Sequence, residues 1–204
     1  MTIHPRALVG EAAAAEVRPG MLVGLGSGTT ADAFVRALGR RVAAGLSMTG
    51  VATSHRTAAL AGELGIPLTT LDDVARLDLG VDGADEIDPQ LDAVKGRGGA
   101  LLREKLVALA CADYLLIAAV EKRVERLGTR LPLPVEVVRF GWRRTADRLR
   151  SIGLEPTLRR IEGDEPFRSD GGHFILDCVT GPIAEPAALA VAIKQITGVI
   201  DHGL

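Results

Sequence analysis

The sequence is poor in aromatic residues. Only 3% of the 204 residues are aromatic, whereas 47% are hydrophobic, so the core must consist mainly of Ala, Val, Leu and Ile. That aliphatic bias is typical of a buried parallel sheet covered by helices. Charged residues make up 25% of the chain, and with this hydrophobic content the composition excludes a disordered protein.

Cysteine is equally scarce. Cys111 and Cys178 are far apart, lie in apolar surroundings and form no CxxC pair. This pattern excludes a disulfide scaffold and predicts two free thiols in a reducing compartment.

The chain also lacks the features of a membrane or nucleic-acid protein. Its longest apolar run, 106–120, is interrupted by Asp113 and is too short to span a bilayer. The N-terminal stretch 1–17 has no continuous apolar core of a signal peptide. Formal net charge is −2, and the basic runs at 143–150 and 159–160 contain no interleaved aromatics. We therefore expect a cytoplasmic protein with neither a membrane nor a nucleic acid as partner.

Strand-like and helix-like segments alternate through the first part of the chain. Strands are expected at 21–25, 67–71, 77–81 and 114–120, and residues 51–54 can end a further strand. Helices are expected at 5–18, 31–42, 55–64 and 99–111. Ser54 is expected to cap the helix that follows it. The last of these helices is expected to bury Leu101, Leu102, Leu106, Leu109 and Ala110. The alternation predicts a doubly wound, Rossmann-like α/β domain, in which ligands bind at the carboxyl ends of the strands.

The segment GLGSGTT, 24–30, joins the first strand to its helix. Such a loop presents backbone N–H groups and hydroxyls to a phosphate at the helix N-terminus. No GK[ST] follows, which excludes a Walker loop, and the third glycine of a dinucleotide fingerprint is missing. A phosphate site and a plain tight turn with a Thr cap both remain open.

The most unusual stretch is Val81–Lys105, VDGADEIDPQLDAVKGRGGALLREK. Five carboxylates precede Lys95, a glycine-rich turn follows, and Glu104 lies on the next helix. Carboxylates, an ammonium and closely approaching backbone favour proton transfer on a polar anionic substrate. A solvated acidic loop is the plainer alternative. A Mg²⁺ site is another, with the ligands Asp82, Asp85, Glu86 and Asp88, although Lys95 argues against it.

A second, smaller pattern begins after the segment LPLP at 131–134. Strands at 135–138, 156–160 and 173–178 and helices at 144–152 and 186–195 give a βαββα order. This order predicts a small α+β domain.

Together these motifs resemble the ribose-5-phosphate isomerase A family. The matching pieces occur in collinear order from end to end: GLGSGTTA, VDGADEID, KGRGGALLREK, LPLPVEVV and DEPFRSDGGHFILDC. The resemblance implies a three-layer α/β domain with a small α+β lid. The ranges are then 1–129 for the catalytic domain and 130–198 for the small domain. Residues 199–204 are the start of a return to the first domain, with the family's usual C-terminal segment absent.

The resemblance also implies an activity. The family interconverts D-ribose 5-phosphate and D-ribulose 5-phosphate through an enediolate, in the non-oxidative pentose phosphate pathway. It uses neither a metal nor an organic cofactor and forms homodimers or tetramers.

Site residues follow from the same resemblance, position by position. Four positions match catalytic residues: Glu104 matches the general base and Lys95 the residue that steadies the enediolate oxygen. Asp82 and Asp85 match the carboxylates that contact sugar hydroxyls and assist ring opening. The remaining matches to substrate-binding positions are Ser27, Gly28, Thr29, Thr30, Gly83, Ala84, Gly96, Arg97, Gly98 and Lys122, with Arg6 near the phosphate.

Arg97 and Leu102 depart from the pattern, because relatives often have glycine at the first position and threonine at the second. A sugar-phosphate sensor without catalysis and a CoA-transferase-like enzyme are the competing interpretations. The retained Glu104 and Lys95 argue against the sensor. The sequence contains no motif typical of the glutamate nucleophile of a CoA-transferase, which argues against the second interpretation.

Overall fold

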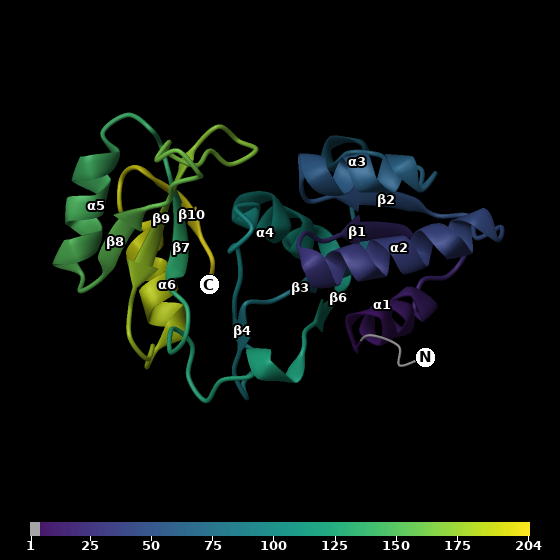
Figure 1. Cartoon of the computed structure of the whole chain (residues 1–204), viewed down its shortest axis with the longest axis horizontal. Helices are drawn as coiled ribbons and strands as arrows, with labels where there is room; N and C mark the ends of the chain where they lie inside the picture. The colour runs from purple at the N-terminus through teal and green to yellow at the C-terminus, as the bar shows by residue number, and fades with distance from the viewer. Residues whose placement is uncertain (1–4) are drawn as a thin grey trace. The chain divides into compact units, whose positions relative to one another are not determined.

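The computed structural model describes residues 5–204 (Figure 1). The first part of the chain contains α1 Pro5–Ala15, β1 Leu22–Leu25, α2 Thr29–Ala43, β2 Thr49–Ala52, α3 His55–Glu63, η1 Leu71–Asp73, β3 Leu77–Gly83, β4 Glu86–Ile87, β5 Ala93–Val94, α4 Leu101–Ala110 and β6 Cys111–Ile117. The second part contains η2 Val120–Lys122, β7 Leu133–Val137, α5 Trp142–Ser151, β8 Glu155–Leu158, β9 Phe174–Val179, α6 Pro186–Lys194 and β10 Val199–His202.

The chain folds as two compact units. The first holds the described residues up to Gly83 together with Arg103–Ala119, and the second holds Ala84–Leu102 with Val120–Leu204. Residues 84–102 and 120–129 thus lie in the second unit, whereas the ranges expected from sequence group them with the first. The boundaries at 129/130 and 198/199 stay predictions.

A parallel sheet in the order β2-β1-β3-β6 forms the centre of the first unit. Helices α1 and α2 pack on one face, where Phe34 and Leu38 are fully buried with Leu25 of β1. On the other face α4 lies very close, since a Cβ at Gly24 would stand 2.6 Å from Val107 Cγ1. Two helical layers around a parallel sheet confirm the predicted three-layer α/β fold.

Helix α3 begins as the sequence predicts. The Ser54 Oγ accepts a hydrogen bond from the Thr57 N–H at 3.0 Å, which satisfies one of the otherwise unpaired donors of the first turn.

One predicted strand is absent and another is displaced along the chain. Residues 67–71 form no strand; Leu68 makes only an isolated bridge to Gly50, and a 3-10 turn follows in which Thr70 Oγ1 donates to Asp73 Oδ2. Local side-chain hydrogen bonding outweighs strand propensity in this polar stretch. The strand expected at 114–120 is β6, three residues earlier, because α4 ends at Ala110.

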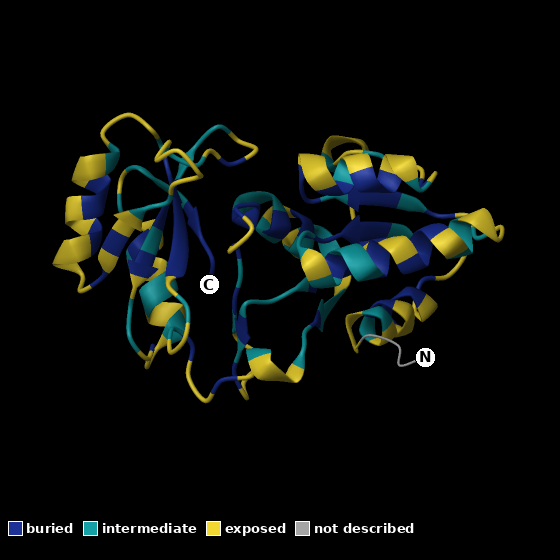
Figure 2. Ribbon diagram, in the orientation of Figure 1, coloured by how far each residue is buried: buried dark blue, intermediate teal, exposed yellow. Residues whose placement is uncertain are grey.

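The buried face of α4 also differs from the prediction. Leu106 and Leu109 are 49% and 79% exposed, and Leu102 is half-buried, whereas Leu101, Glu104 and Val107 are buried. These three positions are spaced by three residues and so share one side of the helix. The helix therefore buries a carboxylate together with its two most buried aliphatic side chains. Figure 2 shows buried and exposed residues along the same helix.

The second unit is built on an antiparallel sheet in the order β10-β7-β9-β8. Its core joins β7 and β9 to the helices α5 and α6 through Val135, Leu176, Leu149 and Ile193, all fully buried. This is the small α+β domain that the sequence predicts. Strand β10 pairs with β7, so residues 199–202 belong to this sheet.

Both cysteines are free, as predicted. Burial raises the pKa of the Cys178 thiol to about 12 and that of Cys111 to about 11, so neither is a reactive thiolate at neutral pH. Among residues 5–204 no helix is long and apolar enough to cross a membrane.

Glu86 is a buried carboxylate that holds the second unit's long loop. It is 1% exposed and accepts hydrogen bonds from three backbone N–H groups, those of Gly128 at 2.6 Å, Arg130 at 2.7 Å and Leu131 at 3.0 Å. Charge-assisted bonds of this kind are the stronger class in proteins.

We predict that Glu86→Gln destabilises the second unit by about 1–3 kcal/mol, because the amide NH₂ would face backbone donors. Urea unfolding followed by fluorescence of Trp142, the only tryptophan of the chain, measures the loss. Glu125→Gln, at an exposed position, is the matched control. Equal unfolding midpoints for the two variants would show that the loop does not depend on this carboxylate.

Candidate active site

The loop after β1 leads directly into α2. Gly28 occupies the N-cap position with φ 102°, and no side chain of the described residues caps the helix there. A left-handed φ of this kind favours glycine. The first N–H groups of α2 and the hydroxyls of Thr29 and Thr30 are thus available at a helix N-terminus, where a phosphate is favoured.

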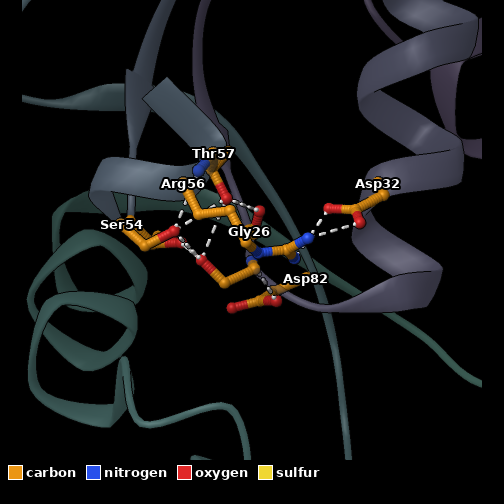
Figure 3. A network of polar contacts seen from close by, with 8 residues as sticks. Gly26, Asp32, Ser54, Arg56, Thr57 and Asp82 are labelled. Atoms are coloured by element: carbon orange, nitrogen blue, oxygen red, sulfur yellow. Dashed lines mark hydrogen bonds and ion pairs between the residues drawn. The ribbon is translucent and has the colours of Figure 1, made fainter. Parts of the chain in front are cut away.

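The loop is hydrogen-bonded to hydroxyl groups of α3 and of the two residues before this helix (Figure 3). The Ser27 Oγ lies 2.8 Å from Thr53 Oγ1, 2.7 Å from Ser54 Oγ and 3.0 Å from Thr57 Oγ1. Thr57 Oγ1 also donates to the Gly26 carbonyl at 3.1 Å. The Ser27 hydroxyl is therefore part of the loop's internal support.

Asp82 joins this loop to the loop after β3. It is 1% exposed, and its Oδ1 accepts from the Ser27 N–H at 3.1 Å and from the Gly83 N–H at 2.7 Å. A Cβ at Gly26 would stand 2.3 Å from that same oxygen, so position 26 has no room for a side chain. The loop after β1 and the carboxyl end of β3 therefore meet. Lys122 lies in η2 of the second unit.

Tyr114 on β6 completes the group of polar side chains. Its hydroxyl donates to Asp82 Oδ2 at 3.4 Å. Burial, followed by the negative charges of Asp82 and Glu104, raises the pKa of Tyr114 far above the ordinary value of 10.0. Glu104, 4% exposed in the first turns of α4, thus shares one electrostatic environment with Asp82 and Tyr114.

The other predicted site residues lie in the second unit. The Asp85 N–H donates to the Val94 carbonyl at 2.8 Å, and Asp85 Oδ2 accepts from the Arg97 N–H at 2.9 Å. The Lys95 N–H donates to the Gly203 carbonyl at 2.8 Å. These bonds place Asp85 against the turn 95–99, which contains Lys95, Gly96, Arg97 and Gly98.

The remaining acidic residues of the stretch support loops. Glu86 is committed to three N–H groups, and Asp88 Oδ1 accepts from Gln90 N–H at 3.0 Å and Asp92 N–H at 2.9 Å. Within the described part of the chain no three acidic, His or Cys side chains come together as metal ligands.

Sequence reasoning missed Thr53, Thr57 and Tyr114. The Thr-Ser-x-x-Thr spacing at 53–57 is the one available signal, since residues three and four apart share a helix face. Tyr114 stands alone in an apolar strand, and a single tyrosine is a weak pattern.

We predict that the pKa of Tyr114, the only tyrosine, lies well above its ordinary value of 10.0 in the folded protein, because burial and the negative charges of Asp82 and Glu104 disfavour the tyrosinate. Because the folded pKa is raised, the stability that neutral Tyr114 contributes is fully present below about pH 10. It is lost as the pH rises through the folded pKa. Tyrosinate absorbance measures this titration, with the urea-unfolded chain as control. A folded-state midpoint equal to that of the unfolded chain would contradict the assigned environment.

Comparison with known proteins agrees with this geometry. The family model described as ribose 5-phosphate isomerase A (phosphoriboisomerase A) matches residues 49–204. The ribose-5-phosphate isomerase A of Synechococcus sp. (strain JA-3-3Ab) is 53% identical over 95% of this chain and 85% of its own length. The ribose-5-phosphate isomerase A of Roseiflexus sp. (strain RS-1) is 56% identical over 95% of this chain and 84% of its own length.

Solved structures give the same result. Ribose 5-phosphate isomerase A from Methanocaldococcus jannaschii superposes with a TM-score of 0.93 and 34% identity, covering 97% of this chain and 88% of that one. A D-ribose-5-phosphate isomerase in complex with phospho-erythronic acid gives a TM-score of 0.94 and 32% identity, over 100% and 90%. The matches extend from sequence to backbone along nearly the whole chain, and the chain belongs to the ribose 5-phosphate isomerase A family.

Proposed function

We infer that this chain is an aldose–ketose isomerase that interconverts D-ribose 5-phosphate and D-ribulose 5-phosphate. The observation that carries the inference is family membership together with a buried carboxylate, Glu104, on the sheet-facing side of α4. The reaction moves one proton between C1 and C2. It needs a base that is shielded from water, because hydration would weaken the basicity of the carboxylate.

We assign the general base to Glu104. Removing a proton from the carbon next to a carbonyl group leaves an enediolate, and the same carboxyl group can return the proton to the neighbouring carbon. Burial excludes competing water, while the rigid helix fixes the direction of the carboxylate.

The enediolate oxygen needs a positive partner, and Lys95 is the residue that we assign to it. Its ammonium and the backbone N–H groups of Gly96 and Gly98 are the donors that we propose for this oxygen, while the Arg97 N–H holds Asp85. Donors that are fixed before the reaction need no reorganisation when the charge develops.

The sugar hydroxyls are assigned to the two acidic loop residues Asp82 and Asp85 with the intervening Gly83 and Ala84. Asp82 Oδ1 already holds backbone N–H groups, so we propose that Asp82 acts on the sugar mainly through the loop it shapes. Phospho-erythronic acid, bound by a relative, fits this account because its carboxylate is planar with two oxygens, as an enediolate is.

For the phosphate we propose the α2 N-terminus. Gly28, Thr29 and Thr30 offer N–H groups and hydroxyls there, and Ser27 anchors the loop. Lys122 and Arg6 are assigned as further cationic contacts to the substrate.

The broader properties follow the family. We propose that catalysis needs neither a metal nor an organic cofactor, and that the chain works in the cytoplasm as a homodimer or tetramer without a nucleic-acid partner. Light scattering during gel filtration measures the oligomer.

We predict that Glu104→Gln lowers the turnover of ribose 5-phosphate by at least about 100-fold, the loss typical of a missing general acid–base. Wild-type turnover should persist in EDTA. Ketose formation measures both, with Glu125→Gln as the charge-matched control at an exposed position.

Each alternative has its own result. Equal turnover of Glu104→Gln and the wild type would eliminate the assigned base. Substrate binding without turnover in the wild type would favour the sugar-phosphate sensor, and loss of activity in EDTA would require a metal.

A further inference from the structure

The turn 95–99 is held by an arginine from a distant part of the second unit. Arg159 follows β8, and its Nη1 donates to the Arg97 carbonyl at 2.8 Å and to the Gly96 carbonyl at 3.3 Å. Gly96 O also accepts the Gly99 N–H at 2.9 Å, which closes the turn. One guanidinium nitrogen therefore bonds two consecutive carbonyls of the segment that follows Lys95.

Arg159 is itself firmly placed. Its Nε donates to Asp177 Oδ2 at 2.8 Å and its Nη2 donates to Asp177 Oδ1, so the pair is bidentate. Asp177 lies on β9, in register with Thr157 of the neighbouring β8. The Arg159 side chain is only 13% exposed. This bidentate pair fixes the plane of the guanidinium. The same guanidinium then donates its remaining hydrogen bonds to the turn.

The turn needs outside support. Gly96 and Gly99 have φ of 92° and 86°, and glycine itself prefers neither sign of φ, so the sequence of the turn restricts its backbone little. The ring of Phe167 lies under the Arg159 guanidinium, 5.7 Å from Cζ to the ring centroid. A Cβ at Gly99 would stand 2.4 Å from the same ring. Phe167 thus packs against both the turn and the arginine.

The arginine's nitrogens are already used by the protein. Nε, Nη1 and Nη2 each donate to a protein oxygen, and the charge is offset by Asp177. Arg159 and Asp177 line a cavity of about 280 Å³ together with Asp85 and Arg97. A guanidinium that is bonded in this way supports its neighbours and is poorly suited to bind substrate.

We propose that Arg159, oriented by Asp177, is a positioning residue for the isomerisation: it fixes the turn 95–99 and thereby the place from which Lys95 meets the enediolate. This inference rests on the proposed function. Position matters here because an error of about 1 Å in a catalytic group can cost about 100-fold in rate.

The test compares Arg159→Met with Arg160→Met, the same change at the adjacent position. Arg160 is a fair control because its guanidinium pairs with Asp164 at 3.3 Å and is 43% exposed. We expect Arg159→Met to lower kcat by about 10- to 100-fold with KM changed less than about threefold, since phosphate binding is assigned elsewhere. Arg159→Lys keeps the positive charge but loses the planar guanidinium, so its kcat should lie between those of Arg159→Met and the wild type. Arg160→Met should match the wild type.

Two further readouts separate positioning from general stability. Hydrogen–deuterium exchange should become faster at residues 95–99 in Arg159→Met and stay unchanged in Arg160→Met. In a Lys95→Met background, Arg159→Met should lower kcat by less than about threefold more, because both changes remove one function. If the separate kcat losses of Lys95→Met and Arg159→Met multiply in the double variant, the proposal is overturned.

The remaining outcomes are also decisive. A folded Arg159→Met with kcat within about threefold of the wild type would refute the positioning role. If circular dichroism shows that this variant is unfolded, Asp177→Asn carries the test, with an expected kcat loss of about tenfold, and unchanged kcat refutes the role. A wild type inactive on ribose 5-phosphate refutes the proposed function instead, while the exchange experiment still decides whether Arg159 holds the turn.

Discussion

The hydrogen bonds from the Ser27 and Gly83 N–H groups to the Asp82 carboxylate are the constraint on which the first unit's site depends. They join the loops after β1 and β3 at the carboxyl ends of two neighbouring parallel strands. The arrangement leaves no space for a side chain at Gly26. The backbone donors replace the hydrogen bonds to water that the buried Asp82 side chain loses on folding. Within the first unit, the proposed phosphate loop is consequently hydrogen-bonded to Asp82 at the end of β3.

The same use of carboxylates recurs along the acidic stretch. Asp85 accepts the Arg97 N–H, Glu86 accepts three N–H groups of the loop 128–131, and Asp88 accepts two from its own turn. A sequence rich in acids therefore gives separate loop supports, each facing its own donors, in place of one cluster of negative charge. Arg159 performs the complementary task, because its guanidinium binds the carbonyls of a turn whose glycines cannot fix it. Charged side chains that hydrogen-bond loop backbone are thus common to both units.

Sequence predicted the parallel sheet, the small α+β domain and the Ser54 cap, because aliphatic periodicity and capping chemistry are local signals. It predicted correctly that α4 buries Leu101, but it also expected Leu106 and Leu109 to be buried, where the structure buries Glu104 and Val107. Hydrophobic periodicity alone cannot identify a buried helix face when one of its buried residues is a carboxylate. The partners Thr57, Tyr114 and Arg159 were equally beyond reach, since each acts across a fold that brings together residues 30 or more positions apart. The roles of the motif residues came from family resemblance, and their assignment stays a prediction.

The central claim is that Glu104 carries the proton between C1 and C2 by way of an enediolate. Transfer of solvent deuterium to C2 of ribose 5-phosphate, followed by NMR in D₂O, tests that step apart from net turnover. The account predicts that the wild type returns ribose 5-phosphate labelled at C2. In folded Glu104→Gln the labelling should be slower by at least about 100-fold. Labelling of equal rate in both proteins would contradict it and would require another base.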